Sequence, residues 1–172
     1  MNPTGSSTRF APPIRASRSR CTRAASLTTL FFSRSNDPIL IGMTGEPIDV
    51  VLVEDNDTFR EALELMLGLT PDVRVVAAVP DGESAVTVCP ELQPDVVLVD
   101  YRLPGLDGVE TTSALRAALP KTAVVVLTAA AEHEEIQALY DAGAVACLTK
   151  DRGVEEIVGA IRVAAGRGAP IG

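Results

Sequence analysis

The chain has 172 residues, 47% of them hydrophobic and only 3% aromatic, so a folded core must be built from Val, Leu, Ile and Ala. This composition favours a parallel sheet covered by helices over an all-β fold, because parallel strands are buried on both faces. The net charge of −8 divides into +5 for the first 42 residues and −13 for the rest. The phosphates of nucleic acid would repel so acidic a body, and we expect no direct DNA binding by the folded part.

The first 45 residues are rich in Ser, Thr, Arg and Pro and show no hydrophobic period, so we expect residues 1–45 to be a disordered extension. Their Arg-rich, acid-poor composition resembles an organelle transit peptide, while the lack of a long apolar core argues against a secretory signal. Alternatively, Met43 is the true start of the protein, because the ordered pattern begins only a few residues later. Both interpretations stay open at this point.

From residue 48 onward, short apolar runs alternate with longer amphipathic stretches. In chain order this pattern predicts a strand at 50–53, a helix at 58–69, a strand at 73–79, a helix at 82–89, a strand at 96–99, a helix at 108–119, a strand at 123–127, a helix at 132–142, a strand at 145–148 and a helix at 154–165. Pro90 and Pro120 are expected to end the second and third helices, and Gly143 the fourth. Five such units predict a doubly wound α/β domain with a five-stranded parallel sheet and helices on both faces.

Polar residues follow most of the predicted strands. Glu54 and Asp55 follow the first strand, Asp100 the third, Thr128 the fourth and Lys150 the fifth. Ligands of such sheets bind at the carboxyl ends of the strands, so these side chains are expected at one edge. Three carboxylates without a nearby His or Cys suit a hard ion such as Mg²⁺. An ionised carboxylate there could attack a phosphoryl group whose oxygens Thr128 and Lys150 would hold.

Four segments carry a family resemblance: Glu54-Asp55, residues 95–108, Thr128-Ala129 and Lys150. In this order at the strand ends they resemble the receiver domain of two-component response regulators, which has the flavodoxin/CheY-like fold. The resemblance covers residues 48–166, so we expect a receiver domain at 46–166 and a tail or truncated linker at 167–172. It implies a cytoplasmic phosphoacceptor protein that is not an enzyme and that switches the binding of its partners.

The resemblance also implies a metal site. Asp55 would bind Mg²⁺ directly and Glu54 would act partly through water. Asp100 and the backbone carbonyl of Arg102 would be further ligands. Pro104 and Gly108 would shape the loop that follows the third strand.

The same resemblance implies a site for the phosphoryl group. Asp100 would accept the group from a sensor histidine kinase, and Thr128, the Ala129 amide and Lys150 would contact its oxygens. Receivers of this type usually carry an aromatic residue three positions before this lysine, where the present chain has Cys147. This change leaves the acceptor chemistry intact. It removes the aromatic side chain that usually couples phosphorylation to output in such receivers.

Segments 58–63 and 160–166 look like the NarL/FixJ subgroup, whose members usually carry a C-terminal helix-turn-helix domain that binds DNA. The sequence ends at Gly172 without a basic reading helix, so we expect a receiver that lacks that domain. A homodimer through the Thr128 loop side or the terminal helices would suit such a protein. No apolar run exceeds six residues, so no membrane association is expected.

Two other functions are compatible with parts of the sequence. The chain could be a fragment of a DNA-binding transcriptional regulator, which an in-frame helix-turn-helix downstream of Gly172 would support. It could also be a phosphohydrolase with an aspartyl-phosphate intermediate. That class needs an Asp-x-Asp pair after the nucleophile strand, whereas Asp100 is followed by Tyr101 and Arg102.

Overall fold

The computed structural model describes residues 31–32, 38–39, 46–130 and 132–168. The chain divides into two compact units, Met1–Gly42 and Met43–Gly172, and each is described by itself. In the first unit, the short strands β1 (Phe31–Phe32) and β2 (Pro38–Ile39) pair antiparallel. The predicted disorder of residues 1–45 otherwise concerns residues outside the described ranges, and it stays a prediction.

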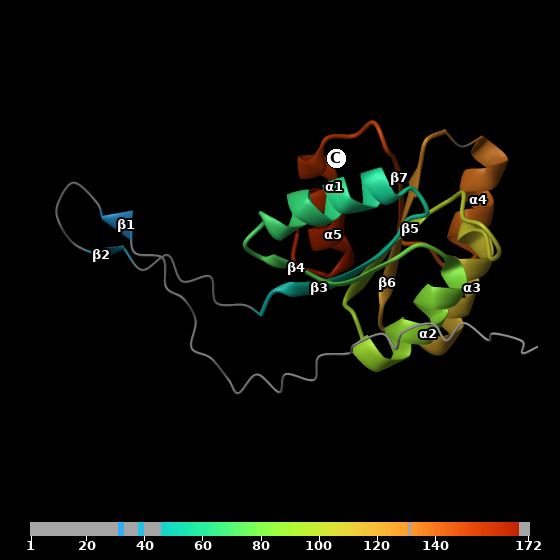
Figure 1. Cartoon of the computed structure of the whole chain (residues 1–172), viewed down its shortest axis with the longest axis horizontal. Coiled ribbons are helices and arrows are strands. Elements are labelled where there is room, and N and C mark those ends of the chain that lie inside the picture. Colours follow the sequence, from blue (N-terminus) through green and yellow to red (C-terminus); the bar gives the residue numbers. More distant parts are fainter. Residues whose placement is uncertain (1–30, 33–37, 40–45, 131, 169–172) are drawn as a thin grey trace, which may run out of the picture. The chain divides into compact units, whose positions relative to one another are not determined.

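The second unit alternates five strands with five helices (Figure 1). In chain order its elements are β3 (Ile48–Val53), α1 (Asp57–Gly68), β4 (Val73–Val79), α2 (Gly82–Leu92), β5 (Val96–Asp100), α3 (Gly108–Ala118), β6 (Ala123–Thr128), α4 (His133–Asp141), β7 (Ala146–Thr149) and α5 (Val154–Ala164). The strands form one parallel sheet in the order β4-β3-β5-β6-β7. The predicted doubly wound, CheY-like α/β fold is confirmed.

Helices bury both faces of the sheet. Successive strand residues point to opposite faces, so each strand contributes side chains to both layers. Val50 and Leu52 of β3 pack in one apolar cluster with α1 and α5, whereas Val51 and Val53 pack in a second cluster with α2, α3 and α4. Figure 1 shows α1 and α5 on one side of the sheet and α2 and α3 on the other. The two layers fix the sheet, and with it the carboxyl ends of β3 and β5.

The helices differ in how firmly they are anchored to this core. α5 buries four residues, whereas α4 buries only Leu139, near its C-terminal end. Helix α4 is therefore held by few apolar contacts, and its first turn lies at the surface.

In the described part of the chain no helix combines the length and apolar character that a membrane crossing requires.

Helix α2 differs from its predicted length. We expected it to end at residue 89, before Pro90, but it continues to Leu92 with Pro90 inside its last turn. A proline removes one N–H donor, and near a C-terminus this costs only one internal hydrogen bond. Gln93 then ends the helix in the left-handed conformation with φ of 49°, and its N–H donates to the Cys89 carbonyl at 2.8 Å.

An ion pair ties the loop before β4 to helix α5. Both carboxylate oxygens of Asp72 accept hydrogen bonds from the Arg162 guanidinium at 2.7 Å, which lowers the pKa of Asp72. The stabilisation is fully present above the unfolded-state pKa, about 3.9, and is lost as pH falls through the lowered folded-state pKa.

We expect Asp72→Asn to lower the free energy of unfolding at pH 7 by about 1 kcal/mol, because the pair is partly exposed to solvent. Urea unfolding at pH 7 and at successively lower pH would measure the difference between the two proteins. The difference should vanish below the lowered pKa of Asp72. Equal stability of both proteins at pH 7 would contradict the expectation.

Candidate functional site

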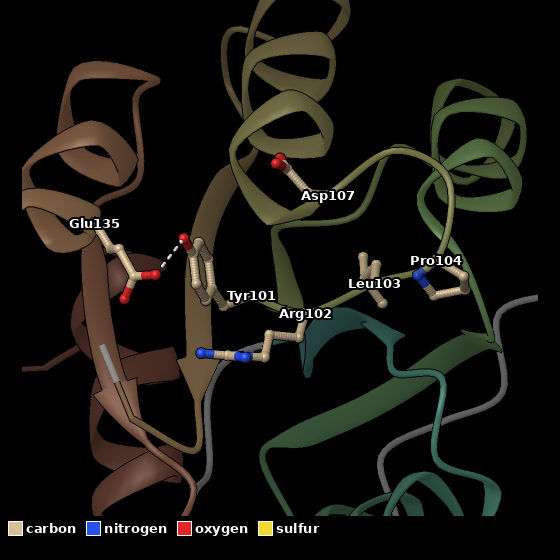
Figure 2. A pocket seen from close by; sticks show the side chains of 6 residues that line it. All are labelled: Tyr101, Arg102, Leu103, Pro104, Asp107 and Glu135. Atoms are coloured by element: carbon tan, nitrogen blue, oxygen red, sulfur yellow. Dashed lines mark hydrogen bonds between the residues drawn. The ribbon is translucent and has the colours of Figure 1, made fainter. Parts of the chain in front are cut away.

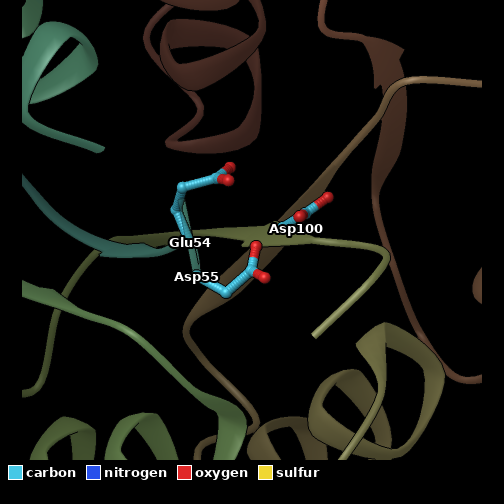
Figure 3. A group of neighbouring side chains, drawn as sticks. All are labelled: Glu54, Asp55 and Asp100. Atoms are coloured by element: carbon cyan, nitrogen blue, oxygen red, sulfur yellow. The ribbon is translucent and has the colours of Figure 1, made fainter. Parts of the chain in front are cut away.

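Three carboxylates meet at the carboxyl edge of the sheet (Figure 3). Glu54 and Asp55 directly follow β3, and Asp100 is the last residue of β5, the strand beside it. One oxygen atom of each side chain lies within 4.8 Å of the others. Glu54 and Asp100 are only 3% and 5% exposed, whereas Asp55 is exposed. Like charges this close repel one another, so the cluster calls for a cation.

Lys150 supplies a positive charge to this cluster. Its Nζ lies 2.7 Å from Glu54 Oε2 and 3.0 Å from Asp100 Oδ2. Burial alone would lower the pKa of Lys150, but its hydrogen bonds to Glu54 and Asp100 outweigh burial and raise the pKa. The ammonium therefore stays charged at neutral pH. It also lies 4.8 Å from the centre of the Phe59 ring, whose face attracts a cation.

The buried Glu54 carboxylate fits a metal ion. Burial is the largest influence on the pKa of Glu54 and raises it, and the nearby Asp100 charge raises it further. Its buried Oε2 atom has no partner other than Lys150 Nζ, 2.7 Å away, in the described part of the chain. A hard divalent cation bound by oxygen atoms of Glu54, Asp55 and Asp100 would offset the burial and the mutual repulsion of these carboxylates.

The loop after β3 holds the acidic pair in place. The Asn56 side chain caps α1 by accepting from the Phe59 N–H at 3.0 Å, and the Asn56 N–H donates to Glu54 Oε1 at 3.3 Å. Arg60 Nη1 donates to the Glu54 carbonyl at 2.6 Å. The first turn of α1 thus fixes the backbone that carries Glu54 and Asp55.

Thr128 ends β6 next to this cluster. Its side chain is 1% exposed, and its hydroxyl donates to the Ala130 carbonyl at 2.9 Å. The Lys150 N–H donates to the Thr128 carbonyl at 2.7 Å, which ties the end of β6 to β7. Ala129 is exposed in the loop that leads to α4. The structure therefore brings Lys150 onto Asp100, whereas the Thr128 hydroxyl bonds within its own loop.

A pocket of about 470 Å³ lies between the loop that joins β5 to α3 and the first turn of α4 (Figure 2). The pocket is lined by Tyr101, Arg102, Leu103, Pro104, Asp107 and Glu135. The Tyr101 hydroxyl donates to Glu135 Oε1 at 3.0 Å, and the Arg102 side chain is exposed. Nothing in these contacts tests the predicted role of the Arg102 carbonyl, which stays a prediction.

Sequence reasoning missed three contacts around the site. These contacts are made by Phe59, Arg60 and Tyr101. The signal for Arg60 and Phe59 was their place in the first turn after the acidic pair, where side chains can fold back over the sheet edge. The pairing of Tyr101 with Glu135 spans 34 residues and left no local pattern.

Comparison with known proteins agrees with this geometry. Residues 50–162 match the response regulator receiver domain family. The chain is 35% identical over 123 residues to the transcriptional regulatory protein LiaR of Bacillus subtilis, covering 72% of this chain and 58% of LiaR. It is 40% identical over 115 residues to the response regulator GacA of Pseudomonas aeruginosa, covering 67% of this chain and 54% of GacA. The chain thus spans only slightly more than half the length of these relatives.

Solved structures give the same result. The signal receiver domain of a NarL response regulator from Mycobacterium tuberculosis has a TM-score of 0.68 and 36% identity, covering 71% of this chain and 98% of that domain. The response regulator domain of CheB from Thermotoga maritima has a TM-score of 0.66 and 29% identity, covering 73% of this chain and all of that domain. With its acidic cluster at the sheet edge, this chain belongs to the response regulator receiver family, a family of phosphoacceptor signalling modules rather than enzymes.

Proposed function

We propose that Asp100 is the phosphoryl acceptor of this receiver and that its partner is a sensor histidine kinase. The observation that carries the proposal is the place of Asp100 at the end of β5, where its carboxylate lies with those of Glu54 and Asp55 and 3.0 Å from Lys150 Nζ. The result of phosphorylation would be a change in the surface of the domain that alters its binding of partners.

In the proposed reaction a carboxylate oxygen of Asp100 attacks the phosphorus of phosphohistidine. The new P–O bond forms an acyl phosphate while the P–N bond breaks, and the electron pair of that bond returns to the imidazole. Lys150 turns from the Asp100 carboxylate to the phosphoryl oxygens, and the Thr128 hydroxyl and the Ala129 amide donate hydrogen bonds to them. No separate base is needed, because the nucleophile is already an anion.

Glu54, Asp55, Asp100 and the Arg102 carbonyl would hold Mg²⁺ in this proposal. When bound, the ion neutralises charge on the carboxylates and on the phosphoryl group.

We expect Mg²⁺ at ten times its Kd to stabilise the protein by about 1.4 kcal/mol, which thermal unfolding would measure. Asp55→Asn should remove most of this effect, since it takes away one anionic ligand. Asp151→Asn, at an exposed aspartate beside Lys150, should leave it intact; equal loss in both variants would contradict the site.

A small phosphodonor tests the proposed function without a known kinase. The full chain is incubated with acetyl phosphate and Mg²⁺, and intact-mass spectrometry follows the gain of one phosphoryl group. We expect uptake that EDTA prevents and that hydroxylamine reverses, since hydroxylamine cleaves acyl phosphates. No uptake at any donor concentration would overturn the proposal.

A second candidate is that this receiver belongs to a transcriptional regulator of the NarL/FixJ type. The relatives LiaR and GacA favour it, because the present chain spans slightly more than half of each. In that case the chain itself makes no contact with DNA, and phosphorylation in the cytoplasm would promote a homodimer through the Thr128 loop side or the terminal helices. The genomic sequence that follows codon 172 tests it, because an in-frame helix-turn-helix is expected there.

A further inference from the structure

The first turn of α4 is bound to the acceptor loop by one side chain. Glu135 uses both carboxylate oxygens there. Oε1 accepts from the Tyr101 hydroxyl at 3.0 Å (Figure 2), and Oε2 accepts from the Glu132 N–H at 2.8 Å. The second bond completes the start of the helix. The hydrogen bond of Tyr101 therefore reaches the residue that organises the first turn of α4.

Tyr101 is the fixed partner of this bond. It directly follows Asp100, its N–H donates to the Leu127 carbonyl at 2.8 Å, and its carbonyl accepts from the Gly108 N–H at 3.0 Å. Sheet and helix α3 therefore hold its backbone from two sides. Helix α4 has only Leu139 fully buried, so its first turn is the partner that can move.

A second tie holds the same end of α4. The Thr128 hydroxyl donates to the Ala130 carbonyl at 2.9 Å, in the loop that leads into the helix. A hydroxyl has a single proton to donate, so this bond is lost when Thr128 donates to a phosphoryl group on Asp100. The bond between Tyr101 and Glu135 then remains as the tie that holds the first turn beside the acceptor loop.

We propose that the Tyr101–Glu135 hydrogen bond is a latch that holds the first turn of α4 in its unphosphorylated position. The latch rests on the proposed phosphorylation of Asp100 and gives it a route to the surface that does not use an aromatic side chain at Cys147. The latch stabilises the resting conformation of the first turn. A phosphoryl group or its analogue that binds the other conformation better must overcome this stabilisation, so the latch lowers its apparent affinity.

Tyr101→Phe tests the latch, because phenylalanine keeps the ring and removes only the hydroxyl. Tyr140→Phe is the matched control, since Tyr140 is an exposed tyrosine of the same helix. Two quantities are compared with the parent: hydrogen exchange of the backbone amides at 132–136 without ligand, and the concentration of beryllofluoride that half-saturates the protein with Mg²⁺. A net hydrogen bond of about 0.5–1.5 kcal/mol corresponds to an effect of roughly twofold to tenfold.

For Tyr101→Phe we expect faster exchange and a lower half-saturating concentration, each within that range, and no change for Tyr140→Phe. An unchanged or higher half-saturating concentration, or unchanged exchange, overturns the latch. If beryllofluoride and acetyl phosphate fail to modify the parent protein, the proposed function fails instead, and the exchange measurement still tests the latch by itself.

Discussion

Replacing Asp100 by asparagine is expected to abolish phosphoryl uptake from acetyl phosphate. The amide has nearly the shape of the carboxylate, but it carries no charge and its nitrogen lone pair is delocalised, so the nucleophile is gone. Glu54 is also buried and lies 2.7 Å from Lys150 Nζ, so this replacement decides between the two buried carboxylates of the cluster. Intact-mass spectrometry should show no added phosphoryl group on this variant under conditions that modify the parent.

The loss should not arise from unfolding. Asp100 raises the pKa of Glu54 by charge repulsion, so its removal relieves part of the strain in the cluster. Lys150 keeps Glu54 as a partner at 2.7 Å. We expect the free energy of unfolding to change by no more than about 1 kcal/mol. Asp151→Asn is the control for charge alone and should be phosphorylated like the parent; uptake by Asp100→Asn at the parental rate would contradict the assignment.

Gly108→Ala is expected to destabilise the protein and to displace the acceptor loop. A Cβ atom at Gly108 would lie 2.7 Å from Tyr101 Cα and 3.0 Å from the Asp100 carbonyl oxygen. These are backbone atoms at the end of β5, which cannot move aside as a flexible side chain would. Overpacking of this kind costs about 1–3 kcal/mol, and relief of the clash would displace the acceptor itself.

Gly68→Ala provides the matched control for this prediction. Gly68 lies in α1 with nothing within 4 Å of its Cβ position. Alanine is favoured over glycine in a helix by up to about 1 kcal/mol, so this variant should be neutral or slightly more stable. Urea unfolding of both variants measures the difference. A Gly108→Ala protein as stable as Gly68→Ala would show that α3 does not approach β5 as closely as described.

The fold and the acidic cluster could be predicted because both follow from local patterns. Apolar runs gave the strands, and in a parallel sheet the residues after them must meet at one edge, which brings Asp55 and Asp100 together. The predicted end of α2 at residue 89 was wrong, because a helix tolerates Pro90 in its last turn, where only one internal hydrogen bond is lost. A breaker residue alone does not say how many residues follow it in the helix.

The remaining contacts depend on side-chain directions that no short pattern encodes. The Thr128 hydroxyl was predicted to face a phosphoryl group, yet in this structure it bonds to Ala130. Its predicted role concerns the phosphorylated protein and stays a prediction. The bond from Tyr101 to Glu135 depends on which face of α4 is turned toward the sheet. The packing of Leu139 sets this orientation, and spacing along the chain does not reveal it.

The shallow anchoring of α4 also bears on how such a protein can diverge. Of the nine residues of this helix only Leu139 is fully buried, so most of its surface can change by substitution without loss of core packing. The acidic edge of the sheet has no such freedom, because Glu54 and Asp100 are buried and both pair with Lys150. Duplicated copies of this domain could therefore acquire new partners through α4 while their phosphoryl chemistry stays the same.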